Sequence, residues 1–371
     1  MKRLIVCCDG TWNRPQEVSD GVPAPTNVAK LALALADEDH EGNEQRLHYQ
    51  AGVGTRRFER FAGGAFGFGL SRNILACYRF LVDNYAPGDK LYFFGFSRGA
   101  YTARSLAGLV RNSGILRPEE RDRIRDAYAL YRRPDKELAP NSIAAALFRR
   151  SHSYAETYID FVGVWDTVGA LGIPIDGFRL PLLSKLWRFH DTDLSRYVLN
   201  AYHALAIDER RRPFRPTVWH QQPGAQGQTL EQVWFAGVHS DVGGGYSDTD
   251  LSEIPLLWMA EKANGCGLAF DPDRLVVTAP PIEPRELRDE GIEVAPNFAG
   301  RLHRSRKGIY RLERAYDRRL ADEKGNPVDG GALASTAEER YERDRTYRPP
   351  GLDERPAKGM PVTPVLPPAR R

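Results

Sequence analysis

Short apolar runs alternate, up to about Pro280, with longer segments in which apolar residues recur every three or four positions. The short runs are typical of buried strands, and the longer segments are typical of amphipathic helices. Expected strands are Arg3–Cys8, Arg46–Val53, the run that ends at Phe96, Thr157–Val164 and Gln232–Val238, and expected helices are Asn27–Ala36, Ser71–Tyr85, Ser195–Ile207 and Leu251–Ala263. This alternation predicts an α/β fold in which helices flank a mostly parallel sheet.

The regular pattern fades after about Pro280, and this change suggests how the chain is divided. We expect one α/β domain over residues 1–280, with an Arg-rich pair of helices inserted at about 117–150. Residues 281–346 are expected to form an irregular C-terminal extension that packs on this domain. Prolines are frequent in residues 347–371, which predicts a flexible tail.

The composition excludes several classes of protein. Of the 371 residues, 42% are hydrophobic and 27% are charged, which is typical of a globular protein. The net charge of +3 gives no reason to expect a nucleic-acid partner. No segment reads as a signal peptide or a transmembrane helix, so we expect a cytoplasmic protein as synthesised, with only peripheral membrane contact. The four cysteines lack metal-site spacing and suggest a reducing compartment.

The sequence Gly95-Phe96-Ser97-Arg98-Gly99 joins an apolar run to an Ala-rich amphipathic segment. A strand, a sharp turn and a helix in this order, with serine at the turn, are typical of a nucleophile elbow. Glycine two residues before and after the serine tolerates the crowded backbone of such a turn. The alternative is an ordinary strand-to-helix turn with a capping serine.

Three other strands end in residues that could work with Ser97, namely Asp9, Asp166 and His239. Because ligands of parallel α/β sheets bind beyond the carboxyl ends of the strands, we expect these side chains to gather at one edge. The order Ser97, Asp166, His239 matches the order of nucleophile, acid and histidine in α/β-hydrolases. The histidine would take the proton of the serine, and the aspartate would orient the imidazole.

Two choices within this set depend on local context. Asp166 is preferred as the acid over Asp241, because Asp241 lies only two residues beyond His239 and supports that ring awkwardly. Asp241 and Asp9 are therefore placed around the site. His203, in a segment with helical character, is expected to be a packed structural histidine, and Asp208 could cap that helix or pair with nearby arginines.

The oxyanion hole should use the backbone N–H of Arg98 together with a donor from another loop at the strand ends. Gly10 and Thr11 are our choice for the second donor, since glycine lets the backbone approach a substrate closely. Asp9 could brace this loop. The alternative for Asp9-Gly10-Thr11 is a simple turn.

Five blocks of the sequence together resemble the signature of one family. They are CCDGTWN (Cys7–Asn13), GFSRGAYTAR (Gly95–Arg104), GVWDTVGALG (Gly163–Gly172), HALAIDERRRPF (His203–Phe214) and WFAGVHSDVGGGY (Trp234–Tyr246). The chain is similar, over about Met1–Ala263, to an α/β-hydrolase domain family that includes type VI secretion system phospholipase effectors. The resemblance implies an α/β-hydrolase fold, with Ser97 as nucleophile and His239 as base.

The same resemblance implies a substrate and partners. Members characterised as effectors cleave fatty acyl esters of glycerophospholipids, so a lipid or another acyl ester is the expected substrate, and no cofactor or metal is needed. Export by a type VI secretion system, with a secretion-system or immunity partner, also follows from the resemblance. The apolar loop Ile173–Trp187 could line an acyl pocket or form a lid, or it could be core packing.

Two other functions remain as alternatives to a serine esterase. A metal-dependent phosphohydrolase could be built from Asp9, Asp166, Asp241 and His239, because oxygen-rich sites bind Mg²⁺ or Ca²⁺. That reading gives the elbow serine no role. A hydrolase-like binding protein without activity is the other alternative, and the intact set of Ser97, Asp166 and His239 argues against it.

Overall fold

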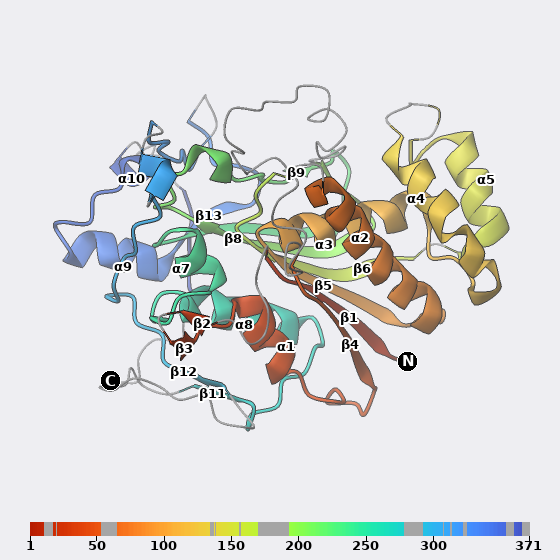
Figure 1. Cartoon of the computed structure of the whole chain (residues 1–371), viewed down its shortest axis with the longest axis horizontal. Coiled ribbons are helices and arrows are strands. Elements are labelled where there is room, and N and C mark those ends of the chain that lie inside the picture. The colour runs from red at the N-terminus through yellow and green to blue at the C-terminus, as the bar shows by residue number, and fades with distance from the viewer. Residues whose placement is uncertain are drawn as a thin grey trace.

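The protein is built around one eight-stranded sheet in which every neighbouring pair of strands is parallel. The computed structural model describes residues 1–10, 18–19, 21–52, 65–133, 137, 139–155, 157–169, 193–277, 292–306, 308–311, 314–321, 325–353 and 360–365. From one edge to the other, the strands are β14 (Val362–Thr363), β13 (Gly331–Ala334), β10 (Thr229–Phe235), β8 (Val198–Ala206), β6 (Ile159–Trp165), β5 (Lys90–Phe96), β1 (Arg3–Cys8) and β4 (Gln45–Gln50). The predicted α/β fold with a mostly parallel sheet is confirmed (Figure 1).

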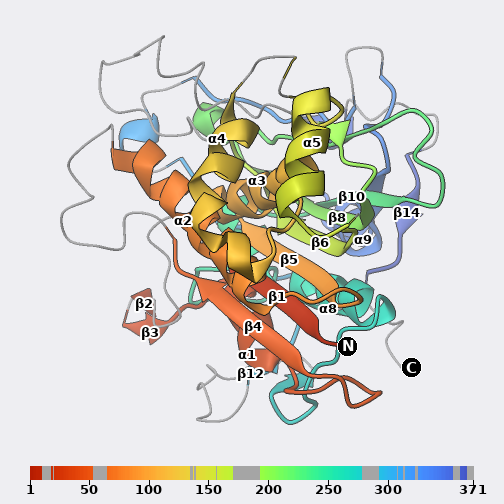
Figure 2. The same cartoon turned by 90° about the vertical axis from the view of Figure 1, so that its right-hand side faces the viewer.

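Helices cover both faces of the sheet, and Figure 2 shows the two helical layers with the strands between them. One layer contains α2 (Ala65–Asn84), α3 (Arg98–Ser113), α4 (Ile124–Arg132) and α5 (Ile143–His152), and the other contains α1 (Asn27–Ala34), α7 (His239–Gly243) and α8 (Glu253–Gly265). In β1, Leu4 and Val6 are buried toward the first layer and Ile5 toward the second. Burial on both faces explains why this strand is apolar throughout.

Shorter elements surround this framework. They are the strand pairs β2 (Val18–Ser19) with β3 (Val22–Pro23), β7 (Asp193–Leu194) with β9 (His220–Gln221), and β11 (Leu275–Val277) with β12 (Ile292–Val294), the 3₁₀ helices η1 (Pro118–Arg123), η3 (Arg212–Phe214) and η4 (Gly308–Arg311), and the helices α9 (Ser335–Arg343) and α10 (Pro350–Asp353). Among the residues described, no helix combines the length and the apolar character that a bilayer crossing requires.

The helix expected at Ser195–Ile207 is wrong, because this segment forms β8 in the middle of the sheet. Residues 201–206 are all buried, since β6 and β10 flank the strand and both of its faces are covered. A strand buried in this way shows no alternation of apolar and polar residues. Its alanines and leucines are also good helix formers, so local propensity indicated the wrong element.

The end of the chain adds two strands to the sheet. β13 pairs with β10, and β14 pairs with β13 at the edge. Met360 and Val365, on either side of β14, are buried. The prediction of a flexible tail is therefore wrong for residues 360–365, and prolines are tolerated there because an edge strand leaves one side of its backbone unpaired. The expected boundary near residue 280, between the α/β domain and the C-terminal extension, stays a prediction.

Candidate active site

Ser97 lies at a strained turn between β5 and α3. Its φ of 57° and ψ of −117° lie outside the regions that most residues adopt. A Cβ atom on Gly95 would lie 2.5 Å from the carbonyl oxygen of Gly99, and one on Gly99 would overlap the carbonyl oxygen of Cys8. Both neighbours must therefore be glycine for the turn to form. The local geometry is that of a nucleophile elbow.

Asp166 lies at the next strand end, directly beside the elbow. In β5 and β6, Phe96 is in register with Trp165, and the Ser97 amide donates a hydrogen bond of 3.0 Å to the Trp165 carbonyl. Asp166 has a φ of 39°, and within the described residues Ser97 and Asp166 are the two non-glycine residues with a positive φ. Backbone strain of this kind persists where the surrounding structure enforces it, and it concentrates at functional sites.

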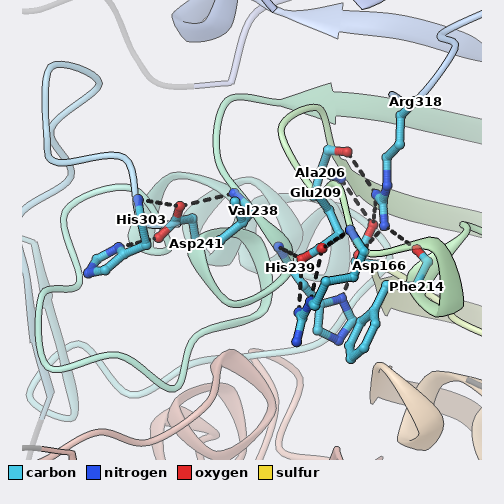
Figure 3. Close-up of polar contacts among 10 residues, drawn as sticks. Asp166, Ala206, Glu209, Phe214, Val238, His239, Asp241, His303 and Arg318 are labelled. Carbon is cyan, nitrogen blue, oxygen red and sulfur yellow. Dashed lines mark hydrogen bonds and ion pairs between the residues drawn. The ribbon is translucent and has the colours of Figure 1, made fainter. Parts of the chain in front are cut away.

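His239 begins α7, just after β10, and its ring contacts Asp166, Phe96 and Phe214, of which Figure 3 shows Asp166 and Phe214. Nδ1 of His239 lies 2.5 Å from Oδ2 of Asp166. The ring packs on Phe96, with centroids 4.6 Å apart, and meets the edge of Phe214 at 4.9 Å. Phe96 directly precedes Ser97, so the strand that carries the serine also supports the imidazole. Because Nδ1 is engaged by Asp166, Nε2 is the nitrogen that can take a proton from a nucleophile.

Arg318 completes the surroundings of Asp166, and sequence reasoning missed it. Its two terminal nitrogens bind both carboxylate oxygens, with Nη1 2.5 Å from Oδ1 and Nη2 2.9 Å from Oδ2. The same nitrogens donate to the carbonyl oxygens of Ala206 at 2.7 Å and Phe214 at 2.6 Å. Arg318 lies in the part of the chain where periodicity fades, and its arginine-rich neighbourhood gave no local signal.

These contacts set the charge state of the pair. Burial alone raises the pKa of Asp166, but the Arg318 charge and the His239 hydrogen bond outweigh it and hold this pKa well below its ordinary value. Burial lowers the pKa of His239 below 6.5, although the Asp166 carboxylate opposes the shift. The pair is therefore an ionised carboxylate and a neutral imidazole at neutral pH, which is the state that a general base requires.

Glu209 and Arg211 add a second charge pair next to His239, in which Glu209 is buried and Arg211 is partly exposed. The His239 amide donates to Oε2 of Glu209 at 3.3 Å, and Arg211 donates to both oxygens of the same carboxylate at 3.0 and 2.9 Å. The Arg211 guanidinium also lies 3.5 Å from the centroid of the Phe214 ring. Sequence reasoning missed these three side chains as parts of the site, although all of them lie in the block HALAIDERRRPF.

Asp241 lies in a separate cluster from the triad candidates, as Figure 3 shows. Its Oδ1 lies 2.6 Å from Nδ1 of His303, and its Oδ2 accepts the Val238 amide at 2.9 Å. Asp241 thus fixes the start of α7 and the loop that carries His303. The structure places Asp166, and not Asp241, against the ring of His239.

His203 lies in β8 and is fully buried among polar partners. Its Nε2 accepts the Thr167 amide at 3.1 Å, so its Nδ1 carries the proton and donates it to Oε1 of Gln232 at 3.3 Å. Burial and the nearby Arg104 lower the pKa of His203 to about 3, which keeps the ring neutral. His203 therefore fixes the backbone of Thr167, the residue that follows Asp166.

Asp208 is held at the ends of the strands by contacts to other segments. Its Oδ2 accepts the Gly237 amide at 2.7 Å and the Tyr347 hydroxyl at 2.9 Å. The nearby Arg210 pairs instead with Asp317, at 2.8 Å. Asp208 thus joins the loop after β10 to the C-terminal part of the chain, and it caps no helix at Ser195–Ile207 because that segment is a strand.

The predicted oxyanion-hole residues differ in what the structure shows of them. Arg98 is the first residue of α3, so its amide lies at the positive end of the helix dipole, next to Ser97. The Gly10 amide donates to Oδ1 of its neighbour Asp9 at 2.6 Å, which directs this donor toward a side chain. Asp9 also accepts hydrogen bonds from Thr26 and Tyr49. Thr11 and the apolar loop Ile173–Trp187 lie outside the described residues.

The arrangement does not fit the metal-dependent alternative. In the described part of the chain, no three His, Cys, Asp or Glu side chains are grouped so that they could hold a metal ion. The carboxylates of that hypothesis have separate partners, with Asp9 bound by Thr26, Asp166 by Arg318 and Asp241 by His303. An arginine on both oxygens of Asp166 would oppose a second cation there.

A parallel sheet, a serine elbow and a buried His–Asp pair at the same edge of that sheet define a protein of the α/β-hydrolase-like class. Residues 2–262 match the family model described as "T6SS, Phospholipase effector Tle1-like, catalytic domain". The chain belongs to this family. The resemblance seen in the five sequence blocks is thereby confirmed.

Similar proteins include relatives that are longer than this chain. An uncharacterized protein of Saccharomyces cerevisiae, YEL023C, is 31% identical over 243 residues, which cover 60% of this chain and 33% of the yeast protein. A crystal structure of an uncharacterized protein from Pseudomonas aeruginosa is 18% identical, covers 73% of this chain and 47% of that one, and has a TM-score of 0.46. The Tle1 effector bound to the VgrG spike of the type 6 secretion system is 21% identical, covers 67% of this chain and 52% of that one, and has a TM-score of 0.38. The chain thus spans about a third of the yeast relative and about half of each of these structures.

Proposed function

We propose that the protein is a serine hydrolase of carboxylic esters, with Ser97, His239 and Asp166 as its catalytic triad. The observation that carries this proposal is the placement of a strained elbow serine beside a buried pair of Asp166 and His239, 2.5 Å apart. Hydrolytic enzymes on unrelated folds use the same three groups in these roles. The supporting contacts of Phe96 and Phe214 hold the imidazole in one orientation.

The reaction would proceed in two steps. The Ser97 hydroxyl attacks the ester carbonyl while Nε2 of His239 takes its proton, and the resulting oxyanion is stabilised by backbone amides at the start of α3. The imidazolium then protonates the leaving alcohol, which departs and leaves an acyl-serine. Water, deprotonated by His239, attacks this ester, and the proton returns to Ser97 as the acid is released.

The most specific substrate that the family supports is a phospholipid. The match to a phospholipase catalytic domain over residues 2–262 favours fatty acyl esters of glycerophospholipids over other esters. A lipid substrate also implies peripheral contact with a membrane surface. Export through a type VI secretion system, with a spike or immunity protein as partner, is proposed on the same family relation, since the Tle1 effector binds the VgrG spike.

The experiment that tests the function is covalent labelling by a fluorophosphonate, followed by assays on short-chain esters and phospholipid vesicles. Ser97→Ala should abolish labelling and turnover while circular dichroism stays unchanged. Ser105→Ala, in the same helix α3, is the matched control and should label like the wild type. Retained turnover in Ser97→Ala would show that another nucleophile does the chemistry.

The same experiment separates the alternatives. Phosphatase activity that is lost on chelation, without labelling, would favour the metal-dependent reading. A folded protein that neither labels nor turns over any ester, but still binds lipid, would favour a silent binding protein.

A further inference from the structure

Arg318 reaches the candidate catalytic carboxylate from outside the residues that match the family model. The match ends at residue 262, and Arg318 follows 56 residues later, between β12 and β13. Its side chain and that of Asp166 are both fully buried, with 0% of each exposed. A segment beyond the matched domain therefore contributes a charge to the centre of the candidate active site.

We propose that Arg318 is a positioning residue for catalysis, which holds the Asp166 carboxylate in the orientation that His239 needs. The C-terminal segment would then complete the active site, and not merely cover the sheet. This inference rests on the proposed function, because it assigns Arg318 a role in that triad.

The hydrogen bonds around Asp166 show how the orientation is fixed. Oδ1 accepts from Nη1 of Arg318 and from the Ala206 amide, and Oδ2 accepts from Nη2 of Arg318 and from Nδ1 of His239. Each oxygen thus has two partners, which fills the lone-pair directions of a carboxylate. Rotation of the carboxylate would break several of these bonds at once. Only the planar fork of an arginine can bind both oxygens in this way.

Arg318 is itself fixed by the backbone. Its two terminal nitrogens also donate to the carbonyls of Ala206, at the end of β8, and of Phe214, in η3. The guanidinium therefore joins the end of β6, the end of β8 and the loop whose Phe214 ring contacts His239. The Arg318 side chain thus connects Asp166 with the loop whose Phe214 ring packs against His239.

The charge of Arg318 also affects the protonation of the pair. The charged groups that surround His239 in the described structure are Asp166, Glu209, Arg211 and Arg318. Asp166 and His239 share a hydrogen bond, so they titrate as a unit. Loss of a nearby cation makes proton binding by this unit more favourable. Removal of Arg318 should therefore move the acid limb of the pH–rate profile to higher pH.

The test uses Arg318→Ala and Arg318→Lys in the full chain, with a soluble short-chain ester as the substrate. We expect kcat of Arg318→Ala to fall by on the order of 10²-fold, as when a catalytic group is misplaced, with KM nearly unchanged. Guanidinium at tens of millimolar should restore part of kcat by filling the space that the side chain leaves, whereas the same concentration of sodium should not. Arg318→Lys keeps the charge but not the fork, so its kcat should fall by about tenfold and its acid limb should stay near the wild-type position.

Arg340 offers a matched control. It is another buried arginine of the C-terminal segment, and its Nη1 donates to the carbonyls of Phe298 and Gly300 at 2.7 Å each. Arg340→Ala should lower the melting temperature, while kcat per folded molecule and the acid limb stay unchanged. Guanidinium should not raise its kcat.

The outcomes distinguish this inference from the proposed function. A folded Arg318→Ala or Arg318→Lys with wild-type kcat would overturn the positioning role, as would equal guanidinium rescue of Arg340→Ala. If Arg318→Ala does not fold, the kcat and acid limb of Arg318→Lys decide the matter alone. Turnover that survives in Ser97→Ala would instead overturn the triad, whatever the Arg318 variants do.

Discussion

Oδ2 of Asp166 lies 2.5 Å from Nδ1 of His239, although the two residues are 73 positions apart in the chain. The contact forms because β6 and β10 both end at the same edge of the sheet, separated only by β8. It distinguishes Asp166 from Asp241, which is close to His239 in sequence but binds His303. Proximity along the chain is therefore a poor guide to which carboxylate contacts the His239 ring, and the strand ends are a better one, as expected from the sequence.

Asp166→Asn should impair turnover far more than Asp241→Asn. The amide cannot support the imidazolium and disfavours the tautomer that leaves Nε2 free, so we expect kcat to fall by about 10³–10⁴-fold. Asp241→Asn should change kcat by less than about tenfold, because Asp241 acts on the start of α7 and on His303. Steady-state kinetics on a soluble ester, with both variants checked for folding, measure the difference. The opposite ranking would make Asp241 the acid.

The wild-type pH profile should have its acid limb below pH 6.5. His239 must be neutral to accept the Ser97 proton, and burial lowers its pKa below the ordinary 6.5. The midpoint of the acid limb is therefore expected to lie below pH 6.5. Measurement of kcat/KM between about pH 4.5 and 8.5, with tryptophan fluorescence to monitor folding, tests this. A midpoint above pH 6.5 would show that the carboxylates near the ring outweigh its burial.

Gly99→Ala should disrupt the elbow. The added methyl group would overlap the backbone carbonyl of Cys8 and lie 2.5 Å from that of Asp9, and neither can move without shifting β1. We expect a loss of at least about 2 kcal/mol in the free energy of unfolding and little fluorophosphonate labelling. Gly265→Ala is the control, since no described atom beyond its own helix and chain neighbours lies within 4 Å of the place that the methyl group would take. It should change stability by less than about 0.5 kcal/mol. If Gly99→Ala and Gly265→Ala lower the free energy of unfolding equally in urea denaturation, the steric argument is contradicted.

Asp208→Asn should stabilise the protein above pH 6. Burial raises the pKa of Asp208 from 3.8 to about 6, so the folded state binds the proton more tightly than the unfolded state. The stability that this proton provides is complete below pH 3.8 and is lost as the pH rises through 6. Asparagine keeps an acceptor for Gly237 and Tyr347 without the buried charge. We expect a gain of about 1–2 kcal/mol at pH 8 that disappears toward pH 4.

Asp39→Asn provides a control of opposite sign. The pKa of Asp39 is lowered because hydrogen bonds from Asn43 and Glu41 and the Arg3 charge outweigh its burial. Its contribution to stability is therefore present above pH 3.8 and lost as the pH falls below that value. Asp39→Asn should destabilise the protein at pH 8. Thermal melts of both variants between pH 4 and 8 test whether Asp208→Asn stabilises and Asp39→Asn destabilises the protein at the higher pH. A loss of stability in Asp208→Asn at pH 8 would contradict the prediction for Asp208.

The parts of the site that sequence reasoning identified are those with short-range causes. The elbow needs glycine at positions 95 and 99 because atoms only a few residues apart, together with β1, leave no room for a side chain. Asp166 and His239 were found because they follow apolar runs, and parallel strands bring their carboxyl ends to one edge. Such patterns can be recognised from the order of residues along the chain.

The tertiary structure decided what depends on neighbours distant in sequence. Residues 198–206 form a strand because β6 and β10 flank them, although their composition favours a helix. Arg318 binds Asp166 across 152 positions, in a region without periodicity, and no local signal marks it. Burial of one charge makes a partner charge necessary, but only packing determines which of the many arginines supplies it. The sequence by itself thus determined which candidate catalytic residues follow the strands. The tertiary structure decided which side chains, such as Arg318, contact and orient them.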